Sequence, residues 1–233
     1  GGSMDLVMKV GEACVFDNVL SEPEFLQVWE LMDRMPYERS DAVLWHKAWS
    51  IADGAILRGP QWLARDPDWS LVPPERAEGM KPFPTDPPPL VNLLEKIRDA
   101  VESQPDLPEI SGIAMSPYVW PPGSSIAWHS DGMSMDQRKV GAVTFYVHKH
   151  WNCEWGGEFL LTDIDADAEG ISSVPTFDNS RLSERIMSTG HGIWIAPKPN
   201  RLIINPANTL HKVSKSTSAA IPRMSIQSFL FED

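Results

Sequence analysis

Apolar residues repeat at helical spacing in two segments of the first half of the chain. Ser21-Glu22-Pro23 combines a capping hydroxyl with an early proline, and the apolar periodicity that follows predicts a helix over residues 22–35. A second helix is predicted after Pro87-Pro88-Pro89, where one apolar stripe runs from Leu90 to Val101 and charged residues face away from it. Both helices are expected to support a sheet.

From about residue 112 onward, short β-type runs alternate with turn residues. Such a series is typical of a sandwich or barrel, so the chain is expected to be mainly β with flanking helices. The predicted strands cover residues 112–118, 141–147, 157–162, 192–195, 201–204 and 224–231.

Two further segments lack a regular period. Residues 52–86 are rich in Pro, Asp and Gly around the isolated Trp62 and Trp69, which predicts a long ordered loop or a lid over a site. Residues 163–170 are acidic, but a calcium loop would need Gly and Glu where Ala168 and Val174 stand. A solvated acidic loop is therefore the prediction.

Length and composition favour one soluble unit. We expect a single domain over residues 4–233, with a helical and loop part at 4–110 and a β core at 111–233; residues 1–3 have the composition of an expression-tag remnant. The net charge of −12 disfavours nucleic acid and anionic membranes as partners.

Targeting and redox signals are absent from this sequence. No apolar run approaches the roughly 20 residues that a membrane helix needs, and the N-terminus lacks the basic-then-apolar layout of a secretory signal, so a cytoplasmic location is expected. Cys14 and Cys153 are expected to be reduced thiols, and the ten Trp are expected to pack in the core.

A metal-binding pattern occupies the second half of the chain. In an extended segment, His129 and Asp131 face the same side because positions i and i+2 of a strand do so. His211 follows Asp131 by 80 residues, and Arg223 follows His211 by 12. Two His and one carboxylate leave three metal positions open, the arrangement that non-heme iron(II) oxygenases use.

With this pattern, residues 118–231 resemble the prolyl-4-hydroxylase-like branch of the Fe(II)- and 2-oxoglutarate-dependent oxygenases. A second block strengthens the resemblance: the sequence Tyr-Val-His-Lys-His-Trp at 146–151 is followed by Trp-Gly-Gly-Glu at 155–158. The family implies a double-stranded β-helix core, a jelly roll similar to that of cupins. His148 stands where the family has Asn.

The resemblance also implies roles for individual residues. His129, Asp131 and His211 would bind Fe(II) and be the catalytic set, while Arg223, Ser225, Tyr118 and Tyr146 would bind the co-substrate 2-oxoglutarate. O2 would be consumed and ascorbate would support activity. The implied reaction hydroxylates an unactivated C–H of an amino acid, a peptidyl residue or a small natural product, with release of succinate and CO2.

Family comparisons also separate the possible reactions. Halogenases of the family lack the carboxylate ligand, so Asp131 favours hydroxylation. The nucleobase demethylases carry an Arg-rich segment after the distal His, which the end of this chain lacks. The loops at 45–86 and 164–190 are expected to select the substrate.

Several alternatives remain open from the sequence. His148 and His150 form a second His-x-His pair that could bind metal instead. His46 and His191 are expected to be ordinary histidines, and Asn205 to belong to a turn before His211. A jelly-roll metal-binding or sensor module without turnover is the alternative function, and both a monomer and a homodimer fit.

Overall fold

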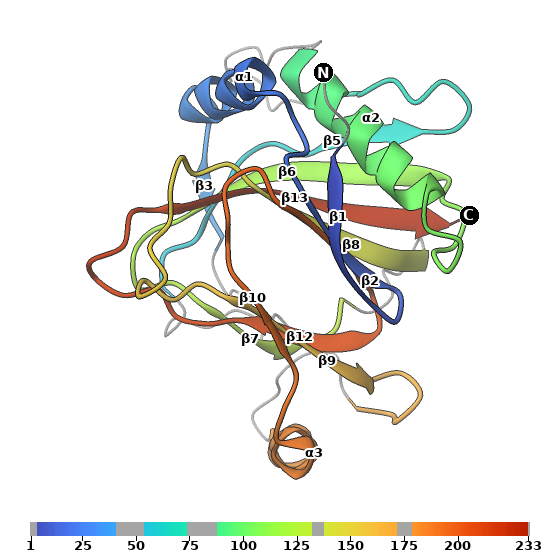
Figure 1. Ribbon diagram of the computed structural model, residues 1–233, viewed down its shortest axis with the longest axis vertical. Coiled ribbons are helices and arrows are strands. Elements are labelled where there is room, and N and C mark those ends of the chain that lie inside the picture. Colours follow the sequence, from blue (N-terminus) through green and yellow to red (C-terminus); the bar gives the residue numbers. More distant parts are fainter. Residues whose placement is uncertain (1–3, 41–53, 74–87, 132–137, 172–178, 233) are drawn as a thin grey trace.

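The computed structural model describes residues 4–40, 54–73, 88–131, 138–171 and 179–232. Three helices and thirteen strands lie in these ranges (Figure 1). In chain order they are β1 (Asp5–Val10), β2 (Ala13–Asp17), α1 (Glu22–Asp33), β3 (Glu38–Arg39), β4 (Leu57–Arg58), β5 (Trp62–Arg65), α2 (Pro88–Glu102), β6 (Gly112–Trp120), β7 (Ile126–His129), β8 (Arg138–Tyr146), β9 (Phe159–Asp165), α3 (Ser180–Thr189), β10 (Ile193–Ile195), β11 (Leu202–Pro206), β12 (Thr209–Val213) and β13 (Arg223–Glu232).

The strands form two antiparallel sheets that face each other. The major sheet has the order β1-β2-β11-β8-β13-β6-β4-β3, with β5 also paired to β6, and the minor sheet has the order β10-β9-β12-β7. Helices α1 and α2 cover the outer face of the major sheet, and α3 lies beyond the minor sheet (Figure 1). This arrangement confirms the predicted mainly β jelly roll with flanking helices.

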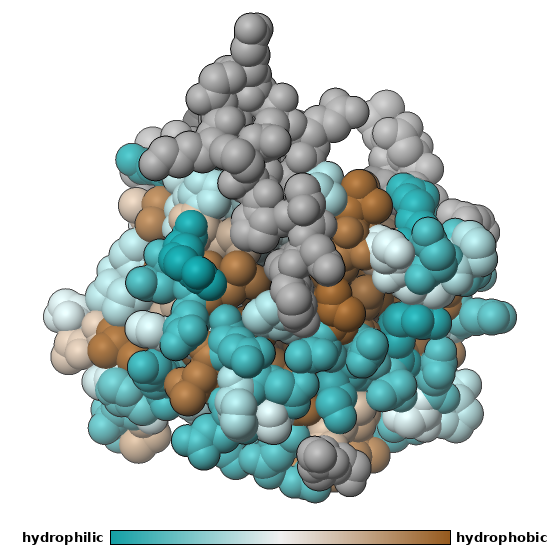
Figure 2. Space-filling model, turned by 90° about the horizontal axis from the view of Figure 1, so that it is seen from above, coloured by the Kyte–Doolittle hydropathy of each residue, from teal (hydrophilic) through white to brown (hydrophobic). Residues whose placement is uncertain are grey.

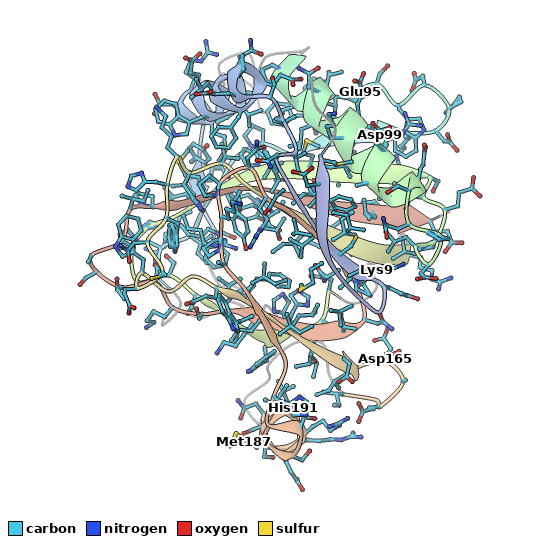
Figure 3. All side chains as sticks on the ribbon, in the orientation of Figure 1. Lys9, Glu95, Asp99, Asp165, Met187 and His191 are labelled. Atoms are coloured by element: carbon cyan, nitrogen blue, oxygen red, sulfur yellow. The ribbon has the colours of Figure 1, made fainter. Side chains whose placement is uncertain are left out.

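Local chemistry explains why the two predicted helices form where they do. In α1, the Ser21 hydroxyl accepts a hydrogen bond from the Glu24 backbone N–H, and the Glu24 carboxylate accepts one from the Ser21 N–H. This capping box satisfies two N–H groups that have no partner inside the helix. In α2, Glu95 and Asp99 point away from the sheet, as the apolar stripe predicts (Figure 3).

Two separate apolar cores divide the side chains of the major sheet. Its outer face packs against α1 and α2 through residues such as Val28, Leu93 and Phe145. Its inner face packs against the minor sheet through residues such as Tyr118 and Phe159. Because strand side chains alternate between faces, strands β2, β6, β8 and β11 contribute to both cores.

The strands of the N-terminal part are the main departure from the predicted pattern. Strands β1 and β2 extend the major sheet at one edge, although residues 4–110 were expected to contain only helices and loops. Neither strand shows the alternation of apolar and polar residues by which a strand is recognised in the sequence. Nearly all of β1 is exposed, and all five residues of β2 are buried.

The described part of residues 52–86 contains strands where a long loop or a lid was expected. Strand β5 pairs with β6, and Trp62 on β5 is fully buried in the core against the helices, on the sheet face opposite the minor sheet. Trp69 packs against the same core and lies under the Arg98 guanidinium. Residues 41–53 and 74–87 lie outside the described residues.

The acidic segment is only partly the loop that was expected. Strand β9 continues to Asp165, whose carboxylate accepts hydrogen bonds from the Asn208 side chain and the Ala168 backbone N–H. The turn that follows leads toward α3, a helix that the hydrophobic pattern does not predict. The segment is therefore a strand end that caps its own turn.

The described surface is mostly hydrophilic, with scattered hydrophobic residues, when the molecule is seen from above (Figure 2). Trp194 is 68% exposed, contrary to the expectation that the Trp residues pack in the core.

Cys14 and Cys153 are both free thiols, as predicted. None of the helices in the described ranges combines the length and apolar character needed to cross a bilayer.

Candidate active site

Strands β7 and β12 position the two histidines of the candidate metal site. His129 and His211 are direct partners in the antiparallel β7–β12 register, and their ring centroids lie 4.3 Å apart. Asp131 follows the end of β7, and its backbone N–H donates to the carbonyl of Ala207 in the turn before β12. The ligand atoms of all three side chains lie within 4.8 Å of one another.

Backbone hydrogen bonds fix which nitrogen each imidazole offers. Nδ1 of His129 lies 2.7 Å from the Ala127 carbonyl, and Nδ1 of His211 lies 2.9 Å from the Thr209 carbonyl. A carbonyl accepts only, so each Nδ1 carries the proton and each Nε2 presents its lone pair. The ring of Phe159 stacks on His211 with an interplanar angle of 16°.

The charges around these histidines suit a cation between them. Burial, followed by the charge of His211, lowers the pKa of His129 to about 4, so the imidazole is neutral and able to bind a metal at physiological pH. The Oδ2 atom of Asp131 is buried without a hydrogen-bond partner, 3.5 Å from Nε2 of His211. A bound cation would satisfy both groups.

These ligands line a cavity of about 330 Å³ between the two sheets. Its wall combines apolar and polar side chains from both sheets. The residues around the three ligands are Arg58, Tyr118, Trp120, Ile126, Ser130, Lys139, Ala142, Thr144, Phe159, Asn205, Val213, Gln227 and Phe229. A cavity of this size accommodates a small molecule or one side chain of a larger one.

Next to this cavity, the start of β13 holds a buried cation. Arg223 is 1% exposed, and its guanidinium lies 4.5 Å from the ring centroid of Trp120, which lines the cavity. Its Nη2 lies 3.5 Å from the Tyr146 hydroxyl, a long contact. Nε and Nη1 of Arg223 and Nε1 of Trp120 are buried donors without an acceptor in the described structure. Clustered donors of this kind suit a carboxylate.

The other predicted co-substrate residues lie on the same inner face of the major sheet. Ser225 is the register partner of both Tyr118 and Tyr146, and its hydroxyl accepts a hydrogen bond from Gln227. Burial raises the pKa of both phenols, and the neighbouring Arg58 and Arg223 only partly oppose this. Both phenols therefore remain protonated donors. Tyr118 lines the cavity, whereas Arg223, Ser225 and Tyr146 lie beside it.

The Gly-Gly-Glu block at residues 156–158 connects two neighbouring strands of the minor sheet. Gly156 and Gly157 have φ values of +74° and +75°, and a Cβ on Gly156 would overlap the carbonyl of Lys215. Only glycine fits such a position without strain. Glu158 and Ser214 exchange backbone and side-chain hydrogen bonds between β9 and β12. This block therefore holds the strand that carries His211.

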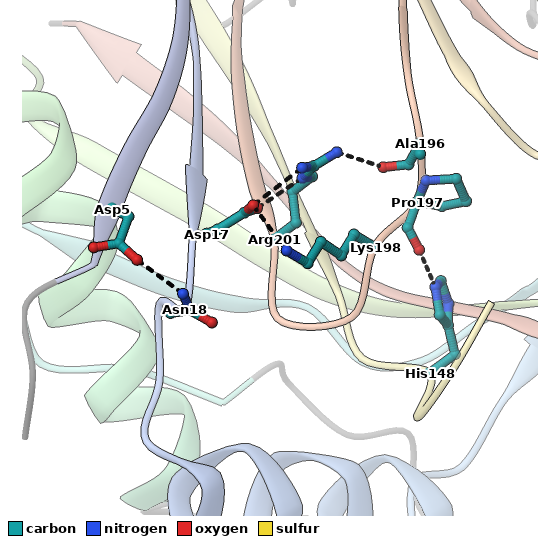
Figure 4. A network of polar contacts seen from close by, with 8 residues as sticks. All are labelled: Asp5, Asp17, Asn18, His148, Ala196, Pro197, Lys198 and Arg201. Atoms are coloured by element: carbon teal, nitrogen blue, oxygen red, sulfur yellow. Dashed lines mark hydrogen bonds and ion pairs between the residues drawn. The ribbon is translucent and has the colours of Figure 1, made fainter. Parts of the chain in front are cut away.

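His148 is a buried structural residue, which argues against the rival His-x-His metal pair. Its Nδ1 accepts from the Met224 backbone N–H at 3.2 Å, and its Nε2 donates to the Pro197 carbonyl at 2.5 Å (Figure 4). Pro197 belongs to the loop in which Arg201 and Lys198 pair with Asp17. His150 packs beside Trp155. Neither nitrogen of His148 is available to a metal.

The remaining histidines lie away from the site or outside the described residues. His191 is exposed beside α3, on the far side of the minor sheet, as expected of an ordinary histidine (Figure 3). It borders a second hollow of about 470 Å³ together with Glu12, Asp163 and Asp165. Among the described residues, only His129, Asp131 and His211 form a cluster able to hold a metal. His46 lies outside the described residues.

The periodicity of the sequence misses several residues of the cavity. Gln227 could have been found, because it continues the i, i+2 series of Arg223 and Ser225 along β13. Asn205 was expected in a turn, yet it belongs to β11 and only Ala207 and Asn208 form the turn. Lys139 could not have been found by alternation, because the β8–β13 register shifts beside it.

A jelly roll with two histidines and one carboxylate converging between its sheets defines the class of non-heme metal-dependent proteins with a facial ligand triad. The chain belongs to the 2OG-Fe(II) oxygenase superfamily, whose family model matches residues 114–231, just over half of its length. It is therefore a 2-oxoglutarate-dependent oxygenase. None of the curated proteins matches the sequence.

Solved structures share the fold at low sequence identity. A prolyl-4-hydroxylase from Pseudomonas putida superimposes with a TM-score of 0.59 at 11% identity, covering 96% of this chain and 94% of the other. A prolyl hydroxylase from Trichoplax adhaerens, in complex with a hypoxia inducible factor peptide, gives 0.56 at 12% identity, covering 95% and 84%. The carbocyclase SnoK from nogalamycin biosynthesis gives 0.60 at 10%, covering 94% and 79%.

Proposed function

We propose that this protein is an Fe(II)- and 2-oxoglutarate-dependent hydroxylase that acts on an unactivated C–H of an amino acid, a peptidyl residue or a small natural product. The observation that carries the proposal is the convergence of Nε2 of His129, Nε2 of His211 and the carboxylate of Asp131 at one end of a cavity. The presence of Asp131 favours hydroxylation over halogenation, because a carboxylate fills the position that a halide would take.

Each residue has a distinct part in this proposal. His129, Asp131 and His211 would hold the iron and leave three coordination positions to co-substrate and oxygen. Arg223 would pair with the distal carboxylate of 2-oxoglutarate, and Tyr118, Tyr146 and Ser225 would support its binding. The support for Arg223 is its burial together with two N–H groups that have no acceptor among the described residues.

Iron(II) and 2-oxoglutarate, when bound, supply the oxidative chemistry, in which decarboxylation to succinate and CO2 accompanies hydroxylation of the substrate. The protein itself holds its histidines in one tautomer through the carbonyls of Ala127 and Thr209. Phe159 and Trp120 are buried side chains that make part of the cavity wall apolar. An apolar wall limits the access of water to the site.

The proposal is tested by measuring succinate formation. Purified protein receives Fe(II), ascorbate and 2-oxoglutarate, first alone and then with a panel of amino acids, peptides and small natural products. We expect slow succinate formation without substrate, which Asp131→Ala and His211→Ala abolish although both variants stay folded. Mass spectrometry of a stimulating panel member should show the gain of one oxygen atom.

A matched control uses a histidine outside the site. His191→Ala removes an exposed imidazole beside α3 and should retain wild-type succinate formation. Folded wild-type protein that binds iron but forms no succinate would contradict the proposal and favour a jelly-roll metal-binding or sensor module. Equal activity in wild type and His211→Ala would reject the proposed metal ligands.

A further inference from the structure

Several polar side chains of the cavity have no part in the proposed roles, and two of them carry this inference. Lys139 on β8 and Asn205 on β11 line the same cavity as His129, Asp131 and His211. The two strands are neighbours in the major sheet, with Asn205 opposite Ala142. Lys139 is three residues before Ala142, about 10 Å along β8, and both side chains line the cavity from this region of the major sheet.

Lys139 brings an ammonium group to this region. Its Nζ lies 4.0 Å from the ring centroid of Phe229, a contact that holds the side chain over the cavity wall. The charge of Asp131 acts on Lys139, but no carboxylate of the described residues lies within ion-pair distance of it. In a chain of net charge −12, a cation in a partly buried cavity without an ion-pair partner is well placed to attract an anionic ligand.

Asn205 brings a buried hydrogen-bond acceptor to the same region. It is 1% exposed, and its Nδ2 donates to the Pro206 carbonyl at 3.0 Å. Its Oδ1 has no donor in the described structure. A buried amide oxygen left without a donor destabilises the protein, so a ligand N–H or O–H that reaches it would bind favourably.

Lys139 and Arg223 lie toward opposite ends of β13 and would serve different carboxylates. Arg223 begins this strand, whereas Lys139 is the register partner of Phe231 near its end. Phe231 is eight positions after Arg223, roughly 26 Å along the strand at about 3.3 Å per residue. With Arg223 as the co-substrate anchor, the Lys139 end is left for the substrate.

We propose that the substrate is a small molecule with a free carboxylate and a neighbouring amino or hydroxyl group, the carboxylate pairing with Lys139 and the N–H or O–H donating to Asn205. Free amino acids, hydroxy acids and the C-terminal residue of a short peptide share this chemistry. The inference rests on the proposed hydroxylase function and narrows its substrate class.

The decisive experiment compares each carboxylic acid with its own carboxamide. Succinate formation is measured with free L-amino acids, α-hydroxy acids and dipeptides, and with the matching primary amides. We expect wild type to prefer a stimulating acid over its amide by about tenfold or more in kcat/KM, since a charge-assisted hydrogen bond is lost with the amide. Lys139→Gln should bring this preference close to one, and Lys139→Arg should largely keep it.

A lysine on the opposite side of the major sheet provides a matched control for the ratio of kcat/KM between acid and amide. Lys149→Gln removes the same charge from a lysine that also lies over an aromatic ring, that of Trp29, which packs against the core beneath the helices. This variant should keep the wild-type acid preference. A general loss of activity would lower kcat/KM for the acid and for the amide alike and leave their ratio unchanged.

Asn205→Leu gives a second readout of the same site. Because leucine has a similar volume but no acceptor, KM for the stimulating amino acid should rise about tenfold, while the corresponding acid without its amino or hydroxyl group should show little change between wild type and variant.

Three results would overturn the inference: equal stimulation of wild type by acids and amides, stimulation by no acid at all, or a rise in KM for 2-oxoglutarate in Lys139→Gln with the acid preference intact. The last result would assign Lys139 to the co-substrate. If wild type forms no succinate under any condition, the proposed function fails instead.

Discussion

His129 and His211 face each other directly across the antiparallel strands β7 and β12, although 82 positions separate them in the sequence. This register brings the two Nε2 atoms to one side of the minor sheet, where Asp131 approaches both, at 3.8 Å from His129 and 3.5 Å from His211. The site is therefore built by one strand pair and the turn that leads into it.

The first prediction is that divalent metal stabilises the folded protein through this set. At a free Mn(II) concentration of about 100 times Kd, the free energy of unfolding should rise by about 2.7 kcal/mol, because the metal binds only the folded ligands. His211→Ala should lose this gain. Urea titrations with and without Mn(II) measure it, and a gain of equal size in His211→Ala would contradict the proposed ligands.

The second prediction concerns the buried cation Arg223. Arg223→Met should raise KM for 2-oxoglutarate by about a hundredfold, because a carboxylate in this environment would lose its paired donors. The unliganded protein should be as stable as wild type or more stable, since the variant removes a buried charge with two N–H groups lacking acceptors. Steady-state kinetics and urea denaturation together separate the two effects.

Arg138→Gln is the control for this variant. Arg138 belongs to the same sheet but is exposed and pairs with Glu232 on the surface, so its removal should leave KM for 2-oxoglutarate unchanged. An Arg223→Met protein with wild-type KM would show that the co-substrate carboxylate binds elsewhere in the cavity.

The third prediction is a pH dependence of stability that originates in His148. Burial lowers the pKa of this imidazole to about 4 in the folded chain, against about 6.5 when unfolded. Between these values only the unfolded chain takes up the proton, so the free energy of unfolding should fall by about 3 kcal/mol as pH drops from 6.5 to 4.

His148→Gln isolates this contribution from those of the other histidines. Glutamine can still donate to the Pro197 carbonyl but does not titrate, so the variant should lose less stability than wild type between pH 6.5 and 4. Urea denaturation at a series of pH values gives the two slopes. Parallel slopes would mean that His148 takes up its proton equally in both states.

The fourth prediction follows from the position of Trp62. Trp62→Ala should destabilise the protein by about 3–5 kcal/mol, because it empties a fully buried site between the major sheet and the helices. The ratio of 2-oxoglutarate consumed to product formed should not change in the folded variant. Trp194→Ala, at a 68% exposed position, should have little effect on stability. A raised ratio in Trp62→Ala would support the lid hypothesis.

Local patterns predicted much of this molecule. Ser21 and Glu24 mark the start of α1 through short-range hydrogen bonds, and the alternation of Arg223, Ser225 and Gln227 identifies one face of β13, because such features depend on neighbours a few residues away. The residues of the metal set and of the Gly-Gly-Glu block could be recognised because each needs a particular side chain or backbone conformation.

The sequence by itself thus determined the ligand types, the jelly-roll class and the two long helices. Only the tertiary structure decided that β1, β2 and β5 belong to the major sheet and that Trp62 lies on its helix side, since strand pairing is a long-range interaction. Lys139 is the sharpest case. Alternation from Tyr146, Thr144 and Ala142 would place Val140 in the cavity, but the β8–β13 register shifts between Leu230 and Phe231. Val140 is the extra residue of β8 at this irregularity, which turns Lys139 inward, and only the pairing with β13 reveals it.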